Sequence, residues 1–249
     1  MRISHLLISF LLAVAANVGA AAPQLYIATE TSPPASMLHN RAVIGSSTDK
    51  VREIMARSGI AYRIDLLPWK RAYTAALHRS NACVYSTTRT PEREKLFRWI
   101  GPLDEAEWVL LALAERGYQF TSIDDARGLR IGTYHGDARD EFLRARGFQV
   151  DSAHNDLINP HKLLLNRIDV WAASLRRGSY TIEKNGWSAN IVPVLTFRTV
   201  QVYLACNKGV PASLAIRMQE ALDGMERDGT SRRIERTYAE WEKQAPKNR

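Results

Sequence analysis

The sequence lacks the motifs that mark several large enzyme classes. It has no phosphate-binding loop of the Walker type, no His-Glu-x-x-His zinc pair and no Gly-x-Ser-x-Gly nucleophile elbow. The six histidines are dispersed, and His154 and His161 have no third ligand nearby, so we expect no metal site and no cofactor. Internal repeats and low-complexity tracts are also missing. These absences argue against nucleotide-dependent, zinc-dependent and serine-hydrolase chemistry.

Long apolar runs are missing too, apart from one near the N-terminus. Arg2 precedes an uncharged stretch from Leu6 to Ala16, and Val18-Gly19-Ala20 fits the small-residue pattern of a signal-peptidase site. We predict a signal peptide over residues 1–21, cleaved after Ala20 or Ala21, and export to the periplasm. The alternative is a membrane anchor, but a spanning helix needs about 20 apolar residues.

Acidic residues are fewer than basic ones, 26 against 34, and the formal net charge is +8. Basic residues are scattered over several segments, and Arg176 and Arg177 are interpreted as part of a solvated face. Nucleic acid is therefore not expected as a partner. The balance favours a small anionic ligand, and the mature chain of about 228 residues is expected to be a monomer.

Only two cysteines are present, Cys83 and Cys206, and each follows an alanine inside an apolar, strand-like run. In the oxidising periplasm such a pair forms a disulfide readily. We predict that the two cysteines are bonded to each other. The alternative is two separate buried thiols.

The remaining chain alternates short strand-like runs with helical stretches, which is typical of an α/β protein with largely parallel sheets. The predicted strands cover residues 24–29, 61–67, 82–88, 108–114, 129–133, 169–173, 190–194 and 200–206. The first predicted helix begins at Ser46-Ser47-Thr48 and ends at Ser58. The other predicted helices cover residues 69–79, 122–126, 137–146, a stretch through Leu165, 211–227 and 231–244.

The last two helices have no strands nearby, which indicates that they pack back on the first group of strands. The chain would then cross between two lobes twice, near 105–109 and 198–202. We predict a first lobe of residues 22–106 plus 199–249 and a second lobe of residues 107–198. A cleft between such lobes is a preferred place for a small-ligand site.

Several segments resemble the bacterial extracellular solute-binding proteins of family 3, the amino-acid type of periplasmic binding protein. The segments that carry the resemblance are Tyr85–Arg93, Phe97–Pro102, Pro68–Ala72, Gly128–Gly132, Asn166–Asp169 and Asp228–Thr230. The resemblance covers nearly the whole mature chain. It implies the type II periplasmic-binding-protein fold, with two lobes, two hinge crossings and a central ligand cleft.

The resemblance also implies roles for individual residues. Arg93 matches the family's arginine for a ligand carboxylate, and a guanidinium suits a carboxylate in bidentate geometry. Ser86 and Thr88 match first-lobe contacts to the ligand. Glu30 matches a group near the ligand's amino end, and Trp69 lies near the family's stacking aromatic. The alternative for Arg93 is a surface arginine paired with Glu92 or Glu94.

The second lobe departs from the family pattern. Gly136 and Asp137 lie at a predicted helix N-terminus that suits an anion, but Asp137 stands where a hydroxyl is usual. Ser174 stands where the family has an aspartate for the ligand's ammonium. Near the first strand, Ser32-Pro33-Pro34 replaces an aromatic. The ammonium would then be bound by Glu30 or Asp137, or the ligand would be a different small anion.

The sequence thus predicts a periplasmic solute-binding protein without catalytic activity. It would capture a small, carboxylate-bearing, amino-acid-like ligand and deliver it to an inner-membrane ABC permease. One alternative is an enzyme resembling cyclohexadienyl dehydratase, with Glu30 or His135 as general acid. Another is a ligand-sensing module for a membrane receptor.

Overall fold

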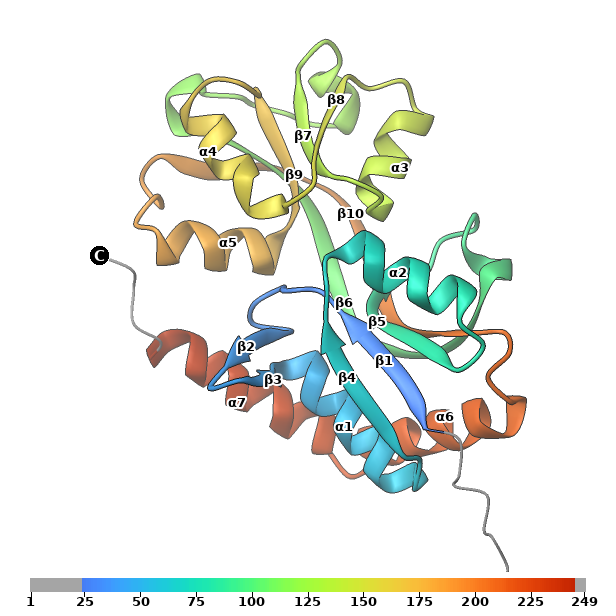
Figure 1. The fold of residues 1–249 in the computed structure, drawn as a ribbon. Coiled ribbons are helices and arrows are strands. Elements are labelled where there is room, and N and C mark those ends of the chain that lie inside the picture. The colour runs from blue at the N-terminus through green and yellow to red at the C-terminus, as the bar shows by residue number, and fades with distance from the viewer. Residues whose placement is uncertain (1–23, 245–249) are drawn as a thin grey trace, which may run out of the picture.

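The structure is a computed structural model and describes residues 24–244 (Figure 1). The predicted signal peptide lies outside the described residues. None of the helices within 24–244 is long and apolar enough to cross a membrane.

Among the described residues, eight strands form one mixed sheet in the order β4-β1-β5-β10-β6-β9-β7-β8. Their bounds are β1 Leu25–Thr29, β4 Tyr62–Leu66, β5 Ala82–Thr88, β6 Phe97–Leu113, β7 Ile131–Tyr134, β8 Val150–Ala153, β9 Val170–Ser174 and β10 Ile191–Asn207. A small hairpin is formed by β2 (Met37–His39) and β3 (Ala42–Ile44). Strands β4, β1 and β5 are parallel to one another, as are β9, β7 and β8. The α/β prediction is confirmed.

Seven α-helices and four short 3₁₀ turns accompany the strands within the described range. The helices are α1 Ser46–Ser58, α2 Trp69–His78, α3 Ala138–Ala145, α4 Asn159–Leu164, α5 Leu175–Lys184, α6 Ala212–Arg227 and α7 Thr230–Gln244. The turns are η1 Glu94–Leu96, η2 Ala114–Arg116, η3 Ile123–Ala126 and η4 Asp156–Ile158. We call β4, β1 and β5 with α1, α2, α6 and α7 the first half, and β9, β7 and β8 with α3, α4 and α5 the second half.

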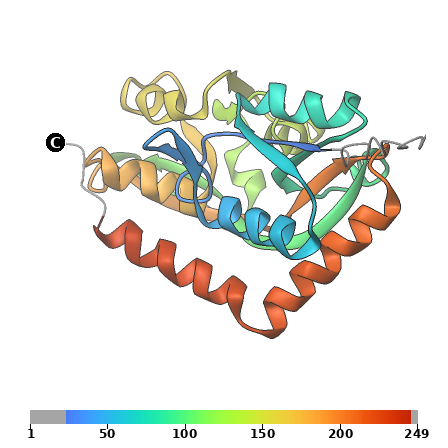
Figure 2. The ribbon, with the colours of Figure 1, turned by 60° about the horizontal axis from the view of Figure 1, so that its bottom comes forward.

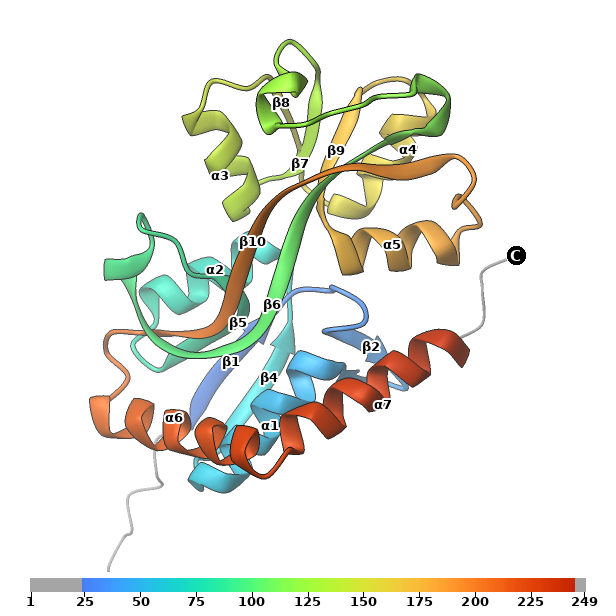
Figure 3. The ribbon, with the colours of Figure 1, turned by 180° about the vertical axis from the view of Figure 1, so that it is seen from behind.

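The two halves are joined by the long strands β6 and β10, which run side by side through both (Figure 3). Glu105 pairs with Gln201 and Glu107 with Thr199 where the strands pass between the halves. The predicted strands 190–194 and 200–206 are therefore one strand, and 108–114 is only the end of another. The ladder between β10 and β6 is irregular between Pro193 and Leu195 and between Thr196 and Arg198, and these irregularities interrupt the regular pattern along the strand.

The first half has a core on each face of its sheet because side chains alternate along a strand. Leu25 and Ile27 of β1 pack with α1 and α6, whereas Tyr26 and Ala28 pack with α2. Figure 2 shows α6 and α7 running along the outside of this half. Tyr238 on α7 donates a hydrogen bond to Asp49 on α1 over 2.6 Å, so the last helix lies against the first half of the molecule.

Helix α1 ends as expected, but its N-terminus differs from the prediction. Gly59 adopts the left-handed conformation with φ of 61° and closes the last turn through its N–H. The N-cap is Gly45, not a serine or threonine hydroxyl. Gly45 has φ of 134°, and a Cβ there would lie 2.2 Å from the carbonyl oxygen of Ala35. A side chain is therefore excluded from this position.

The predicted disulfide is present. Cys83 of β5 and Cys206 of β10 are directly opposite each other in the antiparallel ladder and are bonded. Both cysteines are fully buried in the core that faces α1 and α6.

Candidate functional site

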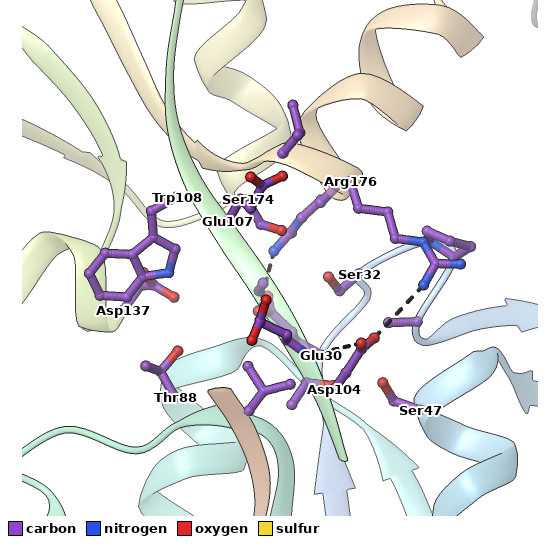
Figure 4. Close-up of a pocket in the computed structure, with 18 of the residues that line it drawn as sticks. Glu30, Ser32, Ser47, Thr88, Asp104, Glu107, Trp108, Asp137, Ser174 and Arg176 are labelled. Atoms are coloured by element: carbon purple, nitrogen blue, oxygen red, sulfur yellow. Dashed lines mark hydrogen bonds and ion pairs between the residues drawn. The ribbon is translucent and has the colours of Figure 1, made fainter. Parts of the chain in front are cut away.

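A cavity of about 390 Å³ lies between the two halves, against β6 (Figure 4). Both halves and β6 contribute polar side chains to its wall. The charged or hydroxyl-bearing lining residues are Glu30, Ser32, Ser47, Ser86, Thr88, Asp104, Glu105, Glu107, Asp137, Arg139, Ser174, Arg176 and Arg177. Five of the eight predicted ligand residues line it: Glu30, Ser86, Thr88, Asp137 and Ser174. Carboxylates and guanidiniums face the same space, so the cavity offers partners to both signs of charge.

Glu30 and Arg177 connect the halves across the cavity. Nη1 of Arg177 lies 3.2 Å from Oε1 of Glu30, and its Nη2 donates to the carbonyl oxygen of Thr31 over 3.0 Å. Burial raises the pKa of Glu30 to about 7, although the charge of Arg177 opposes the rise. Burial and the neighbouring Glu30 also raise the pKa of Tyr134 to about 12.

Arg177 was interpreted from the sequence as a solvated residue, and this was wrong. It belongs to a buried row of charges in the second half, with Asp156 between Arg177 at 3.6 Å and Arg139 at 3.9 Å. Arg139 continues the row to Asp137, over 2.7 Å. Burial disfavours the charge of Asp137, but Arg139 outweighs it and lowers the pKa of Asp137 below its ordinary value. A run of arginines does not reveal which one turns inward, so sequence reasoning missed Arg139, Asp156 and Arg177.

Ser86 has an unusual backbone conformation, with φ of 58°. It lies in a bulge, where two residues of β5 face one residue of β10 between the pairs Thr87–Tyr203 and Val84–Ala205. Bulges of this kind redirect a side chain. The Oγ of Ser86 is buried and has no hydrogen-bond partner among the described residues, while Ser86 lines the cavity.

Arg93 is buried but is not among the cavity-lining residues. Its Nε and Nη2 donate to Oε2 of Glu141 on α3, over 3.1 and 2.8 Å, and the guanidinium lies 4.8 Å from the centre of the Tyr73 ring. The alternative of a surface arginine paired with Glu92 or Glu94 is wrong, because Arg93 is 2% exposed. Glu94 instead pairs with Arg89. Contact of Arg93 with a ligand stays a prediction.

Trp69 and Gly136 also lie outside the lining of the cavity. Nε1 of Trp69 donates to the carbonyl oxygen of Gly136 over 2.8 Å, and the Trp69 N–H donates to the Tyr134 hydroxyl over 2.9 Å. Trp69 therefore contributes a further polar contact between the halves. In this structure its ring packs on Tyr73 in the first-half core.

The N-terminus of α3 was predicted to suit an anion, and a carboxylate of the chain itself already occupies this position. Asp137 is the N-cap, and its Oδ1 accepts from the N–H of Arg139 over 2.8 Å and from Nε of Arg139 over 2.7 Å. Ser174 occupies the N-cap position of α5 without a capping hydrogen bond from its side chain, and it has no carboxylate to offer an ammonium. Asp104 on β6 lies 3.8 Å from Arg176 and is an acidic side chain of the same wall.

Within residues 24–244, no group of three or more histidine, cysteine or carboxylate side chains is placed to hold a metal ion. His135, the other candidate acid, does not line the cavity, and its ring lies 5.2 Å from that of His154.

The model of the bacterial extracellular solute-binding proteins, family 3, matches residues 25–240. The chain belongs to this family. Solved structures with the same fold include a histidine kinase sensor domain similar to periplasmic binding proteins, with 18% identity over 87% of this chain and 96% of the other, and a TM-score of 0.81. The fold is the type II periplasmic-binding-protein fold, as predicted.

Two further solved structures of similar fold are described by the amino acids that they bind. The arginine-, lysine-, histidine-binding protein ArtJ from Geobacillus stearothermophilus is 16% identical over 87% of this chain and 95% of its own, with a TM-score of 0.76. The GluR0 ligand-binding core from Nostoc punctiforme, in complex with L-glutamate, is 19% identical over 86% of this chain and 98% of its own, with a TM-score of 0.75. A search of curated proteins found no match.

Proposed function

We propose that the exported chain captures a small, amino-acid-like ligand in the cavity beside β6. The observation that carries this proposal is the cavity wall, which contains carboxylates, guanidiniums and hydroxyl groups from both halves. A zwitterion needs such a wall, because each of its charges must be paired once water is excluded.

The ligand's cationic group is assigned to Glu30. Glu30 is buried beside Arg177, but its raised pKa indicates that Arg177 does not fully offset the cost of burying its charge. An ammonium group at Glu30 would supply the missing positive charge. This assignment replaces the family's aspartate, whose position is occupied by Ser174.

The ligand's carboxylate is assigned to Ser86, Thr88 and Arg93. Ser86 has an unpartnered buried hydroxyl and Arg93 an unpartnered buried Nη1 within the described part of the chain. In the open state the carboxylate would dock on the first half, and the second half would then close over it by bending β6 and β10. The two halves would thus move as the predicted lobes.

The test is a thermal-shift screen of the refolded mature protein, which carries no retained ligand, against L-amino acids, polyamines, dicarboxylates and prephenate. A ligand at 100 times its Kd adds about 2.7 kcal/mol of stability. For a chain of this size that is a rise of roughly 5–10 °C in melting temperature. The proposal fails if no amino acid or related carboxylate produces a rise, and consumption of prephenate would identify an enzyme instead.

The partner is proposed to be an ABC-type permease of the inner membrane. Co-purification of the liganded protein with membrane fractions would identify the partner. Recovery of a receptor kinase in place of a permease would assign the chain to sensing.

A further inference from the structure

Arg93 and Glu141 form an ion pair that joins the two halves. Arg93 follows β5 in the first half, whereas Glu141 lies on α3 in the second. Two nitrogens of Arg93, Nε and Nη2, donate to the same oxygen of Glu141, and Nη2 also donates to the carbonyl oxygen of Gly136 over 3.3 Å. The contact breaks whenever the two halves separate, because its partners belong to different halves.

The two partners are held very differently. The side chain of Arg93 is 2% exposed and that of Glu141 is 48% exposed. Arg93 is fixed against the Tyr73 ring, and its Nη1 is buried without a hydrogen-bond partner in the described range. A carboxylate with two available oxygens would bind a guanidinium in bidentate geometry. Glu141 uses one oxygen only, so Arg93 is an incompletely satisfied donor with a movable partner.

Two other carboxylates lie at this end of α3, and neither is movable, because Asp140 in the first turn accepts hydrogen bonds from Thr133, Arg144 and Ser152. Asp137 is bonded to both the backbone N–H and the Nε of Arg139, and Arg139 is itself buried. A ligand carboxylate that approaches the space between Arg93 and α3 therefore meets one replaceable anion, Glu141.

We propose that Glu141 competes with the ligand's carboxylate for Arg93. This inference rests on the proposed function, because it requires a ligand carboxylate at Arg93. Without ligand, Glu141 takes the carboxylate's place and holds the halves together. When ligand binds, its carboxylate displaces Glu141, which turns to solvent. Glu141 then acts as a specificity-determining residue, since only a carboxylate that also reaches Nη1 outcompetes it.

The competition predicts the direction in which ligand affinity changes when Glu141 is replaced. That direction distinguishes it from an ion pair that is kept in the complex. If the ligand displaces Glu141, removal of the Glu141 charge destabilises only the closed form without ligand, and affinity for the ligand rises. If Glu141 instead keeps its bond to Arg93 in the complex, the same change destabilises the complex, and affinity falls.

The experiment compares the mature wild type with Glu141→Gln and the matched control Glu115→Gln. The control removes the same charge from an exposed turn at the far end of β6. Titration calorimetry is run with each L-amino acid that raises the wild-type melting temperature, and X-ray scattering is recorded without ligand. Hydrogen bonds to charged groups are stronger than those between neutral groups. We therefore expect Glu141→Gln to bind roughly tenfold more tightly and to show a larger radius of gyration, while the control matches wild type.

Three outcomes are informative. Tighter binding by Glu141→Gln, and no effect of the same change in an Arg93→Ala background, supports the competition. Equal or weaker binding by Glu141→Gln overturns it and leaves the proposed function intact, because the wild type still binds. Glu141→Ala, at a half-exposed position that tolerates truncation, must change affinity in the same direction. Absence of any wild-type binding is a failure of the proposed function and is detected before the variant is used.

Discussion

Replacement of Glu30 by glutamine is expected to change how stability depends on pH. Glu30 is buried between the halves, and the charged groups around it are Arg177, Arg139, Asp137 and Asp156, with the hydroxyl of Tyr134 beside them. Its pKa is about 7 in the folded protein, against an ordinary value of 4.5. The folded state therefore holds the Glu30 proton more tightly than the unfolded state does.

The sign and size follow from proton linkage. Because the folded pKa is raised, this contribution to stability is fully present below pH 4.5 and is lost as the pH rises through 7. Between pH 5 and pH 8 the loss amounts to about 2.5 kcal/mol, from 1.36 kcal/mol per pH unit over the interval in which only the unfolded state is ionised. Glu30→Gln has no such loss, since glutamine does not ionise.

Urea unfolding of wild type and Glu30→Gln at pH 5 and pH 8 measures the effect. We expect the difference in free energy of unfolding, variant minus wild type, to be about 2.5 kcal/mol larger at pH 8 than at pH 5. Glu105→Gln, at an exposed position on the rim of the same cavity, is the control and should parallel wild type. A difference between wild type and Glu30→Gln that is equal at both pH values would refute the reasoning.

Two further predictions concern the scaffold. The double change Cys83→Ser and Cys206→Ser opens a loop with a sequence separation of 123 residues, and the chain-entropy relation gives a loss of about 5 kcal/mol; urea unfolding with and without reductant measures it, and unchanged stability would contradict it. Gly45→Ala forces a Cβ to 2.2 Å from a backbone oxygen and should cost at least about 3 kcal/mol. Gly117→Ala has the same sign of φ but nothing within 4 Å, so thermal unfolding should show a cost of only about 1 kcal/mol; equal costs would contradict the steric argument.

Local patterns were sufficient for most of the secondary structure. Strand β5 was predicted with its observed bounds, and α1 with its observed end, because alternation and a left-handed glycine are encoded within a few residues. Helix α5 was missed, because its ten residues hold three basic side chains and the helix-weakening Gly178. That glycine lets α5 approach β6, where a Cβ would lie 2.7 Å from Leu111.

The candidate site was predicted in part. Sequence reasoning selected Glu30, Ser86, Thr88, Asp137 and Ser174, which line the cavity, but it treated Arg177 as solvent-exposed. The ion pair between Arg177 and Glu30 joins residues 147 positions apart, and no local pattern specifies such a partner.

The sequence by itself determined the family and the α/β class, because both depend on residue types at short or characteristic spacing, and it determined the cysteine pair because only two cysteines are present. The tertiary structure alone decided which charges meet. It turned Arg177 inward to Glu30, placed Asp137 on its own helix and brought Glu141 to Arg93. Charge pairing depends on which faces of distant elements come together, and that is settled only when β6 and β10 carry the two halves into contact.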